Sequence, residues 1–154
     1  MRCEVRVRAA GVGDLAAVLP LERATAEAPH WAEAEYRAAL DDAAAVRRCL
    51  MVAEVEGRVV GFAVGKVAAG VGELESVAVA GEARRQGVGR ALCVAVMGWC
   101  REQGAGTMEL EVRAGSVGAI GLYEVLGFVK VGTRRGYYRE PVEDALLMQR
   151  ELRD

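Results

Sequence analysis

The sequence predicts a mixed α/β (α+β) fold in which helices cover the faces of one sheet. Segments in which apolar and polar residues alternate are interleaved with segments in which apolar residues recur at helical spacing. Hydrophobic residues make up 53% of the 154 residues and charged residues 27%, a globular composition with enough apolar surface for a core. No proline- or serine-rich linker divides the chain, so we expect one domain spanning residues 1–154.

The first half of the chain predicts three strands and two helices. Residues 3–8 alternate apolar with charged side chains, as a half-buried strand does. Asp14 opens a helix, and residues 29–31 form an interruption before a second helical stretch. Two runs rich in β-branched residues, 49–54 and 58–67, flank a Glu-Gly turn signal and predict a hairpin.

The second half continues the alternation of strand and helix patterns. Strands are expected at residues 73–79, 107–113, 128–138 and 144–151. Helices are expected at about 87–103 and 119–126, and glycines follow each of them. The whole predicted order is therefore β-α-α-β-β-β-α-β-α-β-β.

Charge and hydropathy exclude several classes of partner. The 20 basic and 22 acidic residues give a formal charge of −2, which removes the simplest argument for a nucleic-acid or anionic-membrane partner and leaves room only for small cationic patches, so we expect neither partner. No apolar run approaches the roughly 18 residues of a membrane span. Charged side chains near the N-terminus occupy the place where a signal peptide would be apolar. We therefore expect a soluble cytoplasmic protein with reduced thiols.

The use of histidine and cysteine restricts the possible chemistry. His30 is the single histidine, so a multi-histidine metal site is excluded and a general base is expected to be a carboxylate. The four cysteines form no Cys-x-x-Cys pair and are expected to be small buried hydrophobic residues. The sequence thus predicts a site without metal.

A glycine-rich segment between an expected strand and an expected helix is the first candidate site. It comprises Arg84, Arg85, Gln86, Gly87, Val88, Gly89 and Arg90. Free N–H groups and the positive dipole end at a helix start, together with arginines, favour a phosphate-bearing ligand. The Lys-Ser/Thr pair of a Walker P-loop is missing, so we expect no metal at the phosphate. A glycine-rich turn with solvated arginines fits the same pattern.

Three further segments each allow a structural and a functional interpretation. In the strand around Glu111, charged side chains share one face, which is either solvated or the wall of a cleft that offers a carboxylate base. Tyr123 lies on the apolar stripe of its helix, either as a core residue with a bonded hydroxyl or as part of a site. Tyr137 and Tyr138 either pack in a hairpin or border a peptide site.

Together these segments resemble the GNAT superfamily of acetyl-CoA-dependent N-acetyltransferases. Residues 84–89 match its Arg/Gln-x-x-Gly-x-Gly/Ala motif. A narrower similarity, to the bacterial ribosomal-protein-alanine N-acetyltransferase (RimI) type, rests on residues 110–113, 119–124, 126–128, 135–138 and 143–145. The resemblance covers about residues 73–152. It implies a central, largely antiparallel sheet with one splayed parallel pair, flanked by helices.

The resemblance implies acetyl-CoA as a cosubstrate and no metal. The backbone of Val77 and Val79 would pair with the pantetheine arm, and residues 84–90 would hold the pyrophosphate. Ser116 stands where the family usually has an asparagine that contacts the cofactor, and the chain contains no asparagine. A serine hydroxyl can still donate or accept a hydrogen bond at that place.

The same resemblance implies the chemistry and the acceptor. Glu111 matches the family's proton acceptor, and Tyr123 matches its proton donor to the departing CoA sulfur. Tyr137 and Tyr138 fall where relatives grip the N-terminal residues of the substrate. The implied reaction is direct attack in a ternary complex by the N-terminal amine of a protein, such as the alanine of a small-subunit ribosomal protein.

Other functions fit a chain whose first half matches the family only loosely. The cofactor half is shared across the superfamily, so the acceptor could also be a small amine or another protein. A non-catalytic acetyl-CoA-binding module is the third hypothesis, and the presence of both Glu111 and Tyr123 argues against it. We expect a monomer or a weak dimer.

Overall fold

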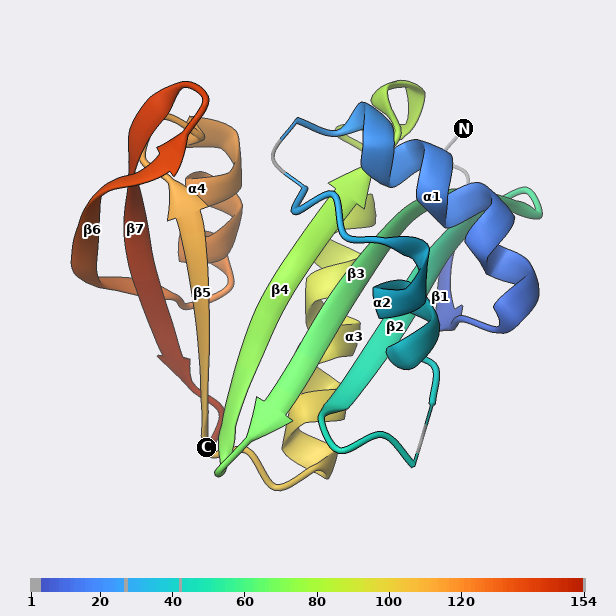
Figure 1. The fold of residues 1–154 in the computed structure, drawn as a ribbon, viewed down its shortest axis with the longest axis horizontal. Coiled ribbons are helices and arrows are strands. Elements are labelled where there is room, and N and C mark those ends of the chain that lie inside the picture. Colours follow the sequence, from blue (N-terminus) through green and yellow to red (C-terminus); the bar gives the residue numbers. More distant parts are fainter. Residues whose placement is uncertain (1–3, 27, 42, 154) are drawn as a thin grey trace.

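The computed structural model describes residues 4–26, 28–41 and 43–153 and forms a seven-stranded sheet with helices on both faces (Figure 1). The strands lie in the order β1-β2-β3-β4-β5-β7-β6. Their bounds are Val5–Ala9 (β1), Arg47–Val55 (β2), Arg58–Ala68 (β3), Val71–Val79 (β4), Thr107–Arg113 (β5), Val129–Arg139 (β6) and Val142–Glu151 (β7). The helices are Leu15–Ala24 (α1), Glu33–Ala38 (α2), Val88–Glu102 (α3) and Val117–Val125 (α4), with short 3-10 turns at Val12–Asp14 (η1) and Gly81–Ala83 (η2). The order of strands and α-helices is the predicted one.

Two apolar clusters attach the helices to the sheet. The helix α3 lies against one face, behind β3 and β4 in Figure 1, because Val88, Leu92 and Val96 form a buried stripe along it. The helices α1 and α2 cover the opposite face, where Val18 and Tyr36 are fully buried. Burial on both faces explains why β3 is a nearly continuous apolar run.

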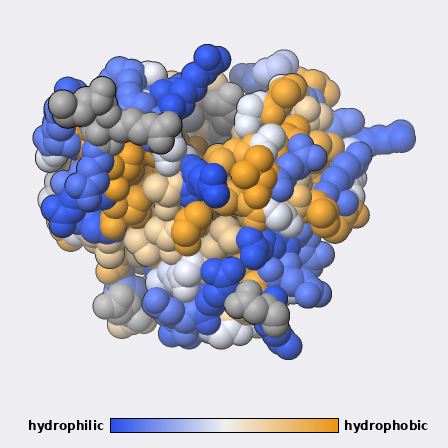
Figure 2. Space-filling model, turned by 180° about the vertical axis from the view of Figure 1, so that it is seen from behind, coloured by the Kyte–Doolittle hydropathy of each residue, from blue (hydrophilic) through white to orange (hydrophobic). Residues whose placement is uncertain are grey.

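The outward sides of α3 and α4 keep some apolar surface exposed. Figure 2 shows hydrophobic residues among hydrophilic ones on the face seen from behind. Val94 of α3 and Val117 and Val125 of α4 are exposed. Scattered apolar side chains of this kind are normal on a protein surface.

The strands β4 and β5 form the parallel pair of the sheet and soon separate. Their register runs from Val71 opposite Thr107 to Leu74 opposite Leu110. Beyond Leu74 the two strands diverge, as the widening gap between their ribbons in Figure 1 shows. The strand β5 continues to pair with β7 as far as Arg113. The predicted antiparallel sheet with one splayed parallel pair is thus confirmed.

A bulge in β4 turns the free half of that strand. The register with β3 passes from Gly65 opposite Leu74 to Val64 opposite Ser76, which leaves Glu75 without a partner residue on β3. Because side chains alternate along a strand, one extra residue sends the following side chains to the other face. The bulge therefore decides which β4 side chains face α1 and α2.

The region of α1 adds detail that the sequence pattern did not give. The helix ends at Ala24, before the predicted interruption at residues 29–31, and contains Pro20, which donates no hydrogen bond because its nitrogen carries no proton. Cys3, part of the first predicted strand, lies outside the described residues. None of the described helices is both long and apolar enough to cross a membrane.

Candidate active site

A cavity of about 670 Å³ lies where β4 and β5 separate. It brings together all the predicted site residues except Gln86 and Tyr137. Val77 and Val79 come from β4, and Arg84, Arg85, Gly87, Val88, Gly89 and Arg90 come from the start of α3 and the loop before it. Glu111, Ser116, Tyr123 and Tyr138 come from β5, α4 with its preceding residue, and β6.

The loop before α3 has the features of an anion site. Arg85 and Gly87 have positive φ angles of 64° and 80°, and turns of this kind gather backbone N–H groups into a concave surface. Within the described part of the chain, no N–H group of residues 85–90 has a hydrogen-bond acceptor. Exposed guanidinium groups and the positive end of the α3 dipole add to the attraction for an anion. This end of the cavity fits a pyrophosphate group.

Gln86 stabilises this loop, and Gly89 lies where the start of α3 approaches α4. The Gln86 Nε2 donates a hydrogen bond to the carbonyl oxygen of Glu82 at 3.2 Å, so the side chain holds the turn and does not line the cavity. A Cβ at Gly89 would lie 3.4 Å from Leu122 Cδ2. An alanine at this position would therefore make an ordinary van der Waals contact with α4.

Glu111 faces the side of the sheet that carries α1 and α2. Val64 of β3 belongs to the apolar cluster under α1 and α2. Lys66 lies two residues further along β3 and therefore faces the same side. Lys66 stands opposite Glu73, and Glu73 stands opposite Glu109 in the parallel register. Residues directly opposite each other share a face, and so do residues two apart on one strand. The Glu111 side chain thus points to the α1–α2 side.

Charged groups surround the Glu111 carboxylate. Its Oε1 lies 3.6 Å from Arg134 Nε, and its charge raises the pKa of the neighbouring Tyr137. Burial, followed by the charges of Glu75 and Glu111, raises the pKa of Glu73. Such a concentration of carboxylates attracts a cationic amine. In the described part of the chain, no group of three or more His, Cys, Asp or Glu side chains is placed to hold a metal ion.

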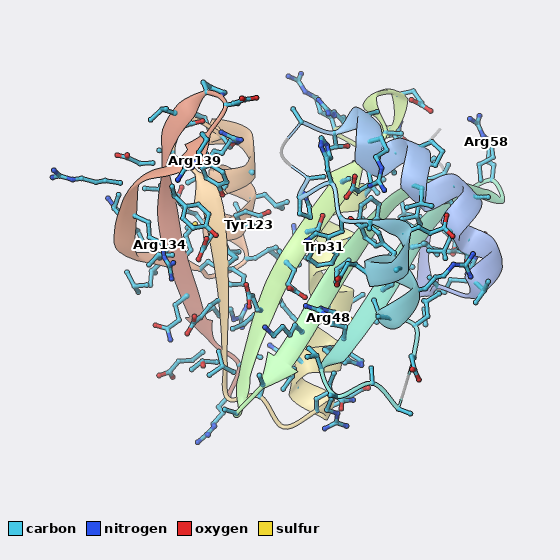
Figure 3. All side chains as sticks on the ribbon, in the orientation of Figure 1. Trp31, Arg48, Arg58, Tyr123, Arg134 and Arg139 are labelled. Atoms are coloured by element: carbon cyan, nitrogen blue, oxygen red, sulfur yellow. The ribbon has the colours of Figure 1, made fainter. Side chains whose placement is uncertain are left out.

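Tyr123 reaches the cavity from α4 and packs against the α3 side of the core (Figure 3). Its ring meets the ring of Phe128 edge-on, with the centroids 6.1 Å apart. Burial raises the pKa of the Tyr123 hydroxyl, so the group keeps its proton at neutral pH. Among the described residues this hydroxyl has no hydrogen-bond partner, which leaves it available to a ligand.

The two tyrosines of β6 lie in different surroundings. Tyr138 lines the cavity, and the guanidinium carbon of Arg113 lies 4.1 Å from its ring centroid. Arg113 is itself held by Glu143, whose Oε1 lies 3.4 Å from Arg113 NH1. Tyr137 is exposed and lies outside the main cavity, with Arg134 5.6 Å from its ring centroid. The structure therefore places Tyr138 inside the site and Tyr137 beside it, next to Glu111.

The model of the acetyltransferase (GNAT) family matches residues 15–128 of the chain. The protein belongs to the GNAT family. It is an acetyltransferase, and the resemblance drawn from the motifs is confirmed.

Relatives of this GNAT enzyme include N-terminal acetyltransferases. The [ribosomal protein bS18]-alanine N-acetyltransferase of Escherichia coli (strain K12) is 39% identical over 94 residues, which are 60% of this chain and 64% of that protein. The N-alpha-acetyltransferase RimI of Mycobacterium tuberculosis (strain ATCC 25618 / H37Rv) is 45% identical over 49 residues, which are 32% of this chain and 31% of that protein. The crystal structure of the ribosomal-protein-S18-alanine N-acetyltransferase from Escherichia coli has a TM-score of 0.84 and 29% identity, covering 98% of this chain and 96% of that one. The sequence matches span less than two thirds of each relative, whereas the fold match covers nearly all of both chains.

In this GNAT enzyme a network that was not predicted holds the segment between α1 and α2. The Oε2 of the fully buried Glu22 accepts hydrogen bonds from the Tyr36 hydroxyl at 2.5 Å and from the Trp31 backbone N–H at 3.0 Å. Arg23 NH1 donates to Glu22 Oε1 at 2.6 Å. Burial alone would raise the pKa of Glu22, but the hydrogen bonds from Tyr36 and Arg23 outweigh it and lower that pKa. The spacing in the sequence could have indicated the burial of Glu22, because Glu22 follows Val18 by four residues on the apolar stripe of α1.

Trp31 extends this network to the cavity wall (Figure 3). The guanidinium carbon of Arg48 lies 5.3 Å from the Trp31 ring centroid, and Arg48 Nε donates to Glu75 Oε1 at 2.7 Å. Glu75, the bulged residue of β4, lines the cavity together with Thr25. His30 does not line it and lies with Nε2 2.9 Å from the Thr25 carbonyl oxygen. Trp31 is thus linked to the wall of the cavity through Arg48 and Glu75.

Proposed function

We propose that this acetyltransferase acetylates the N-terminal α-amine of a protein, with acetyl-CoA as the acetyl donor. The main support is the cavity in the split sheet. Glu111 borders it from the face that carries α1 and α2, whereas Tyr123 and the loop of residues 84–90 border it from the α3 side. A base on one side, and an acid with an anion site on the other, suit transfer from a CoA thioester to an amine.

The residues on the α3 side fit acetyl-CoA. The unpaired N–H groups of residues 85–90 and the nearby arginines suit its pyrophosphate. Because β4 loses its partner after Leu74, the backbone at Val77 and Val79 is open to the pantetheine amides, as to an added strand. Ser116 offers one hydroxyl in place of the usual asparagine amide. Acetyl-CoA supplies an activated acetyl thioester, and this chemistry needs no metal.

Glu111 and Tyr123 each carry out one proton transfer of the proposed reaction. An N-terminal ammonium has a pKa of about 8, so at neutral pH Glu111 must first take a proton from it, directly or through water. The amine nitrogen then forms the new C–N bond as the C–S bond breaks, and its second proton passes to water, which restores the proton that Tyr123 gives to the leaving sulfur. Tyr123 donates a hydrogen bond or a proton to the leaving sulfur. Holding amine and thioester side by side supplies much of the acceleration.

The relatives and the surroundings of Glu111 support a protein acceptor. The Escherichia coli relative is named for the alanine of ribosomal protein bS18, and we infer an acceptor of the same class. Glu73 and Glu109 share the face of Glu111 and favour a cationic amine. Tyr138 in the cavity and the exposed Tyr137 are available to hold the first residues of a peptide. A ribosomal acceptor would place the reaction in the cytoplasm.

Intact-mass analysis of peptides tests this function. Peptides that begin with alanine, serine or methionine and are otherwise identical, each containing one internal lysine, are incubated with acetyl-CoA and the protein. The expected product carries one acetyl group on the α-amine of the alanine peptide, and peptides with a blocked α-amine stay unmodified. Acetylation confined to lysine side chains or to free small amines would refute the proposal and support a different GNAT acceptor.

A further inference from the structure

We propose that Ser76 binds the acceptor, with its hydroxyl hydrogen-bonded to the N-terminal residue of the incoming peptide. The inference rests on the proposed function and assigns a residue that recognises its substrate. Ser76 lines the cavity and is 7% exposed. Among the described residues, its Oγ is the one buried side-chain nitrogen or oxygen atom that has no hydrogen-bond partner.

An unpaired buried hydroxyl calls for an explanation. Buried polar groups nearly always have a hydrogen-bond partner, because burial removes the water that would otherwise solvate them. Glu22, the other buried polar or charged residue among those described, accepts hydrogen bonds from three donors. Alanine at position 76 would remove the unpaired group altogether. A bound molecule that pairs with the Ser76 hydroxyl accounts for a serine at this place.

The bulge in β4 puts Ser76 on the same face as the proposed base. Leu74 packs in the α3-side cluster, and in a regular strand Ser76, two residues later, would face the same way. Because Glu75 is bulged, Ser76 instead stands opposite Val64, which packs under α1 and α2. Glu111 points to that same side. Ser76 therefore faces the amine and not the cofactor loop.

The neighbours of Ser76 favour a peptide as its partner. Glu75 is engaged by Arg48, and Thr25 of the α1–α2 segment lines the same cavity. A serine hydroxyl can accept from an amine N–H and donate to a carbonyl oxygen. The N-terminal residue of a peptide offers both groups close together, whereas a lysine side chain has no carbonyl near its amine. Ser76 thus favours α-amines over side-chain amines.

Kinetics of Ser76→Ala, measured with the alanine-starting peptide and saturating acetyl-CoA, test the inference. The peptide KM should rise about three- to tenfold, the range expected for one neutral hydrogen bond, while the Kd of acetyl-CoA stays at the wild-type value. The urea midpoint of unfolding should stay equal or rise, because the variant removes an unpaired buried group. Ser116→Ala, at the other serine of the chain, is the matched control and should weaken acetyl-CoA binding with the peptide KM unchanged.

Each other outcome has a definite meaning. An unchanged peptide KM in Ser76→Ala overturns the inference. So does a lower urea midpoint, or an equal loss of affinity for peptide and acetyl-CoA, since either shows a structural task for the hydroxyl. In both cases a wild-type protein that acetylates peptide α-amines leaves the proposed function intact. A wild-type protein that acetylates no peptide α-amine overturns the proposed function and the Ser76 inference together.

Discussion

Glu111 and Tyr123 differ in environment in the way that their proposed tasks require. Glu111 lies among charged groups, 3.6 Å from the Arg134 guanidinium, on the face open to a cationic amine. Tyr123 packs against Phe128 in the core, and burial raises its pKa. A phenol with a raised pKa keeps its proton through the physiological range. The carboxylate is therefore accessible to the amine, and the phenol is present in the protonated form that the proposed reaction needs.

Glu111→Gln and Tyr123→Phe should each lower kcat by about 100-fold, a typical contribution of one general acid or base. Both variants keep the shape of the side chain, so acetyl-CoA should bind with its wild-type Kd in isothermal titration. The deficit of Glu111→Gln should shrink between pH 7 and pH 9.5, because the acceptor amine, with a pKa of about 8, is then already neutral. The loss of kcat in Tyr123→Phe should stay the same over this pH range. Wild-type turnover in either variant would assign that residue a structural task only.

The raised pKa of Tyr123 also predicts the alkaline behaviour of the wild-type enzyme. A higher pKa means that the proton is lost at higher pH, above the usual tyrosine value of about 10. Wild-type kcat should therefore show no fall between pH 8 and pH 10. If wild-type kcat falls between pH 8 and pH 10 and kcat of Tyr123→Phe does not, the Tyr123 phenol ionises in that range and the prediction is wrong.

At the scale of elements, the segment between α1 and α2 depends on one buried carboxylate. Glu22→Gln should lower the free energy of unfolding by about 2 kcal/mol, because an amide oxygen that keeps the bonds from Tyr36 and Trp31 leaves the amide NH2 group buried against the Arg23 guanidinium, donor facing donor. Urea unfolding measures the change. Glu33→Gln is the matched control, since Glu33 forms an exposed pair with Arg37 at 2.8 Å and should change stability by less than about 0.5 kcal/mol.

The effect of Glu22→Gln should depend on pH with a defined sign. The folded protein holds the pKa of Glu22 below its ordinary value of about 4.3, so the carboxylate stabilises the fold at neutral pH. That contribution is complete above the ordinary pKa and disappears as the pH falls through the lowered one. The difference between Glu22→Gln and wild type should therefore narrow below about pH 4. An equal difference at pH 3 and pH 7 would show that the charge of Glu22 is not involved.

The loop before α3 permits a test in which only charge differs. Gly87 has a φ of 80° and open space beyond it, a conformation that both asparagine and aspartate tolerate better than other side chains. Gly87→Asp places a negative charge beside the proposed pyrophosphate site and should raise the Kd of acetyl-CoA about tenfold above that of Gly87→Asn. The difference in Kd between the two variants should become smaller as salt is added, because salt screens the charge. Equal affinities of the two folded variants for acetyl-CoA would refute the placement of the pyrophosphate at this loop.

The elements were predictable wherever local periodicity determines them, and most residues of the candidate site could be proposed because its motifs are local. The strand over residues 107–113 and the glycine-rich start of α3 were correctly placed by alternation and helical spacing. The splay of β4 from β5 came from family resemblance, because pairing between strands far apart in sequence leaves no local pattern. The bulge at Glu75 and the burial of Glu22 were missed, since each depends on a partner from another element.

At the scale of the whole molecule, the split sheet separates the residues proposed to bind the two substrates. The loop before α3 lies on the α3 side and Glu111 faces the α1–α2 side, so the proposed acetyl-CoA and acceptor sites border one cavity from opposite faces of the sheet. The described cysteines Cys49, Cys93 and Cys100 are buried, and burial raises their pKa values to about 12, 12 and 11. They therefore remain protonated and are poor nucleophiles.

This separation predicts transfer within a ternary complex and no acetylated enzyme. Initial rates measured at several fixed acetyl-CoA concentrations, with the alanine-starting peptide varied, should give intersecting double-reciprocal lines. The protein incubated with acetyl-CoA alone should show no acetyl adduct by intact mass, because neither the buried thiols nor the proposed chemistry of Glu111 and Tyr123 forms a covalent intermediate. Parallel lines together with an adduct that disappears when peptide is added would require a nucleophile on the enzyme and would refute direct transfer.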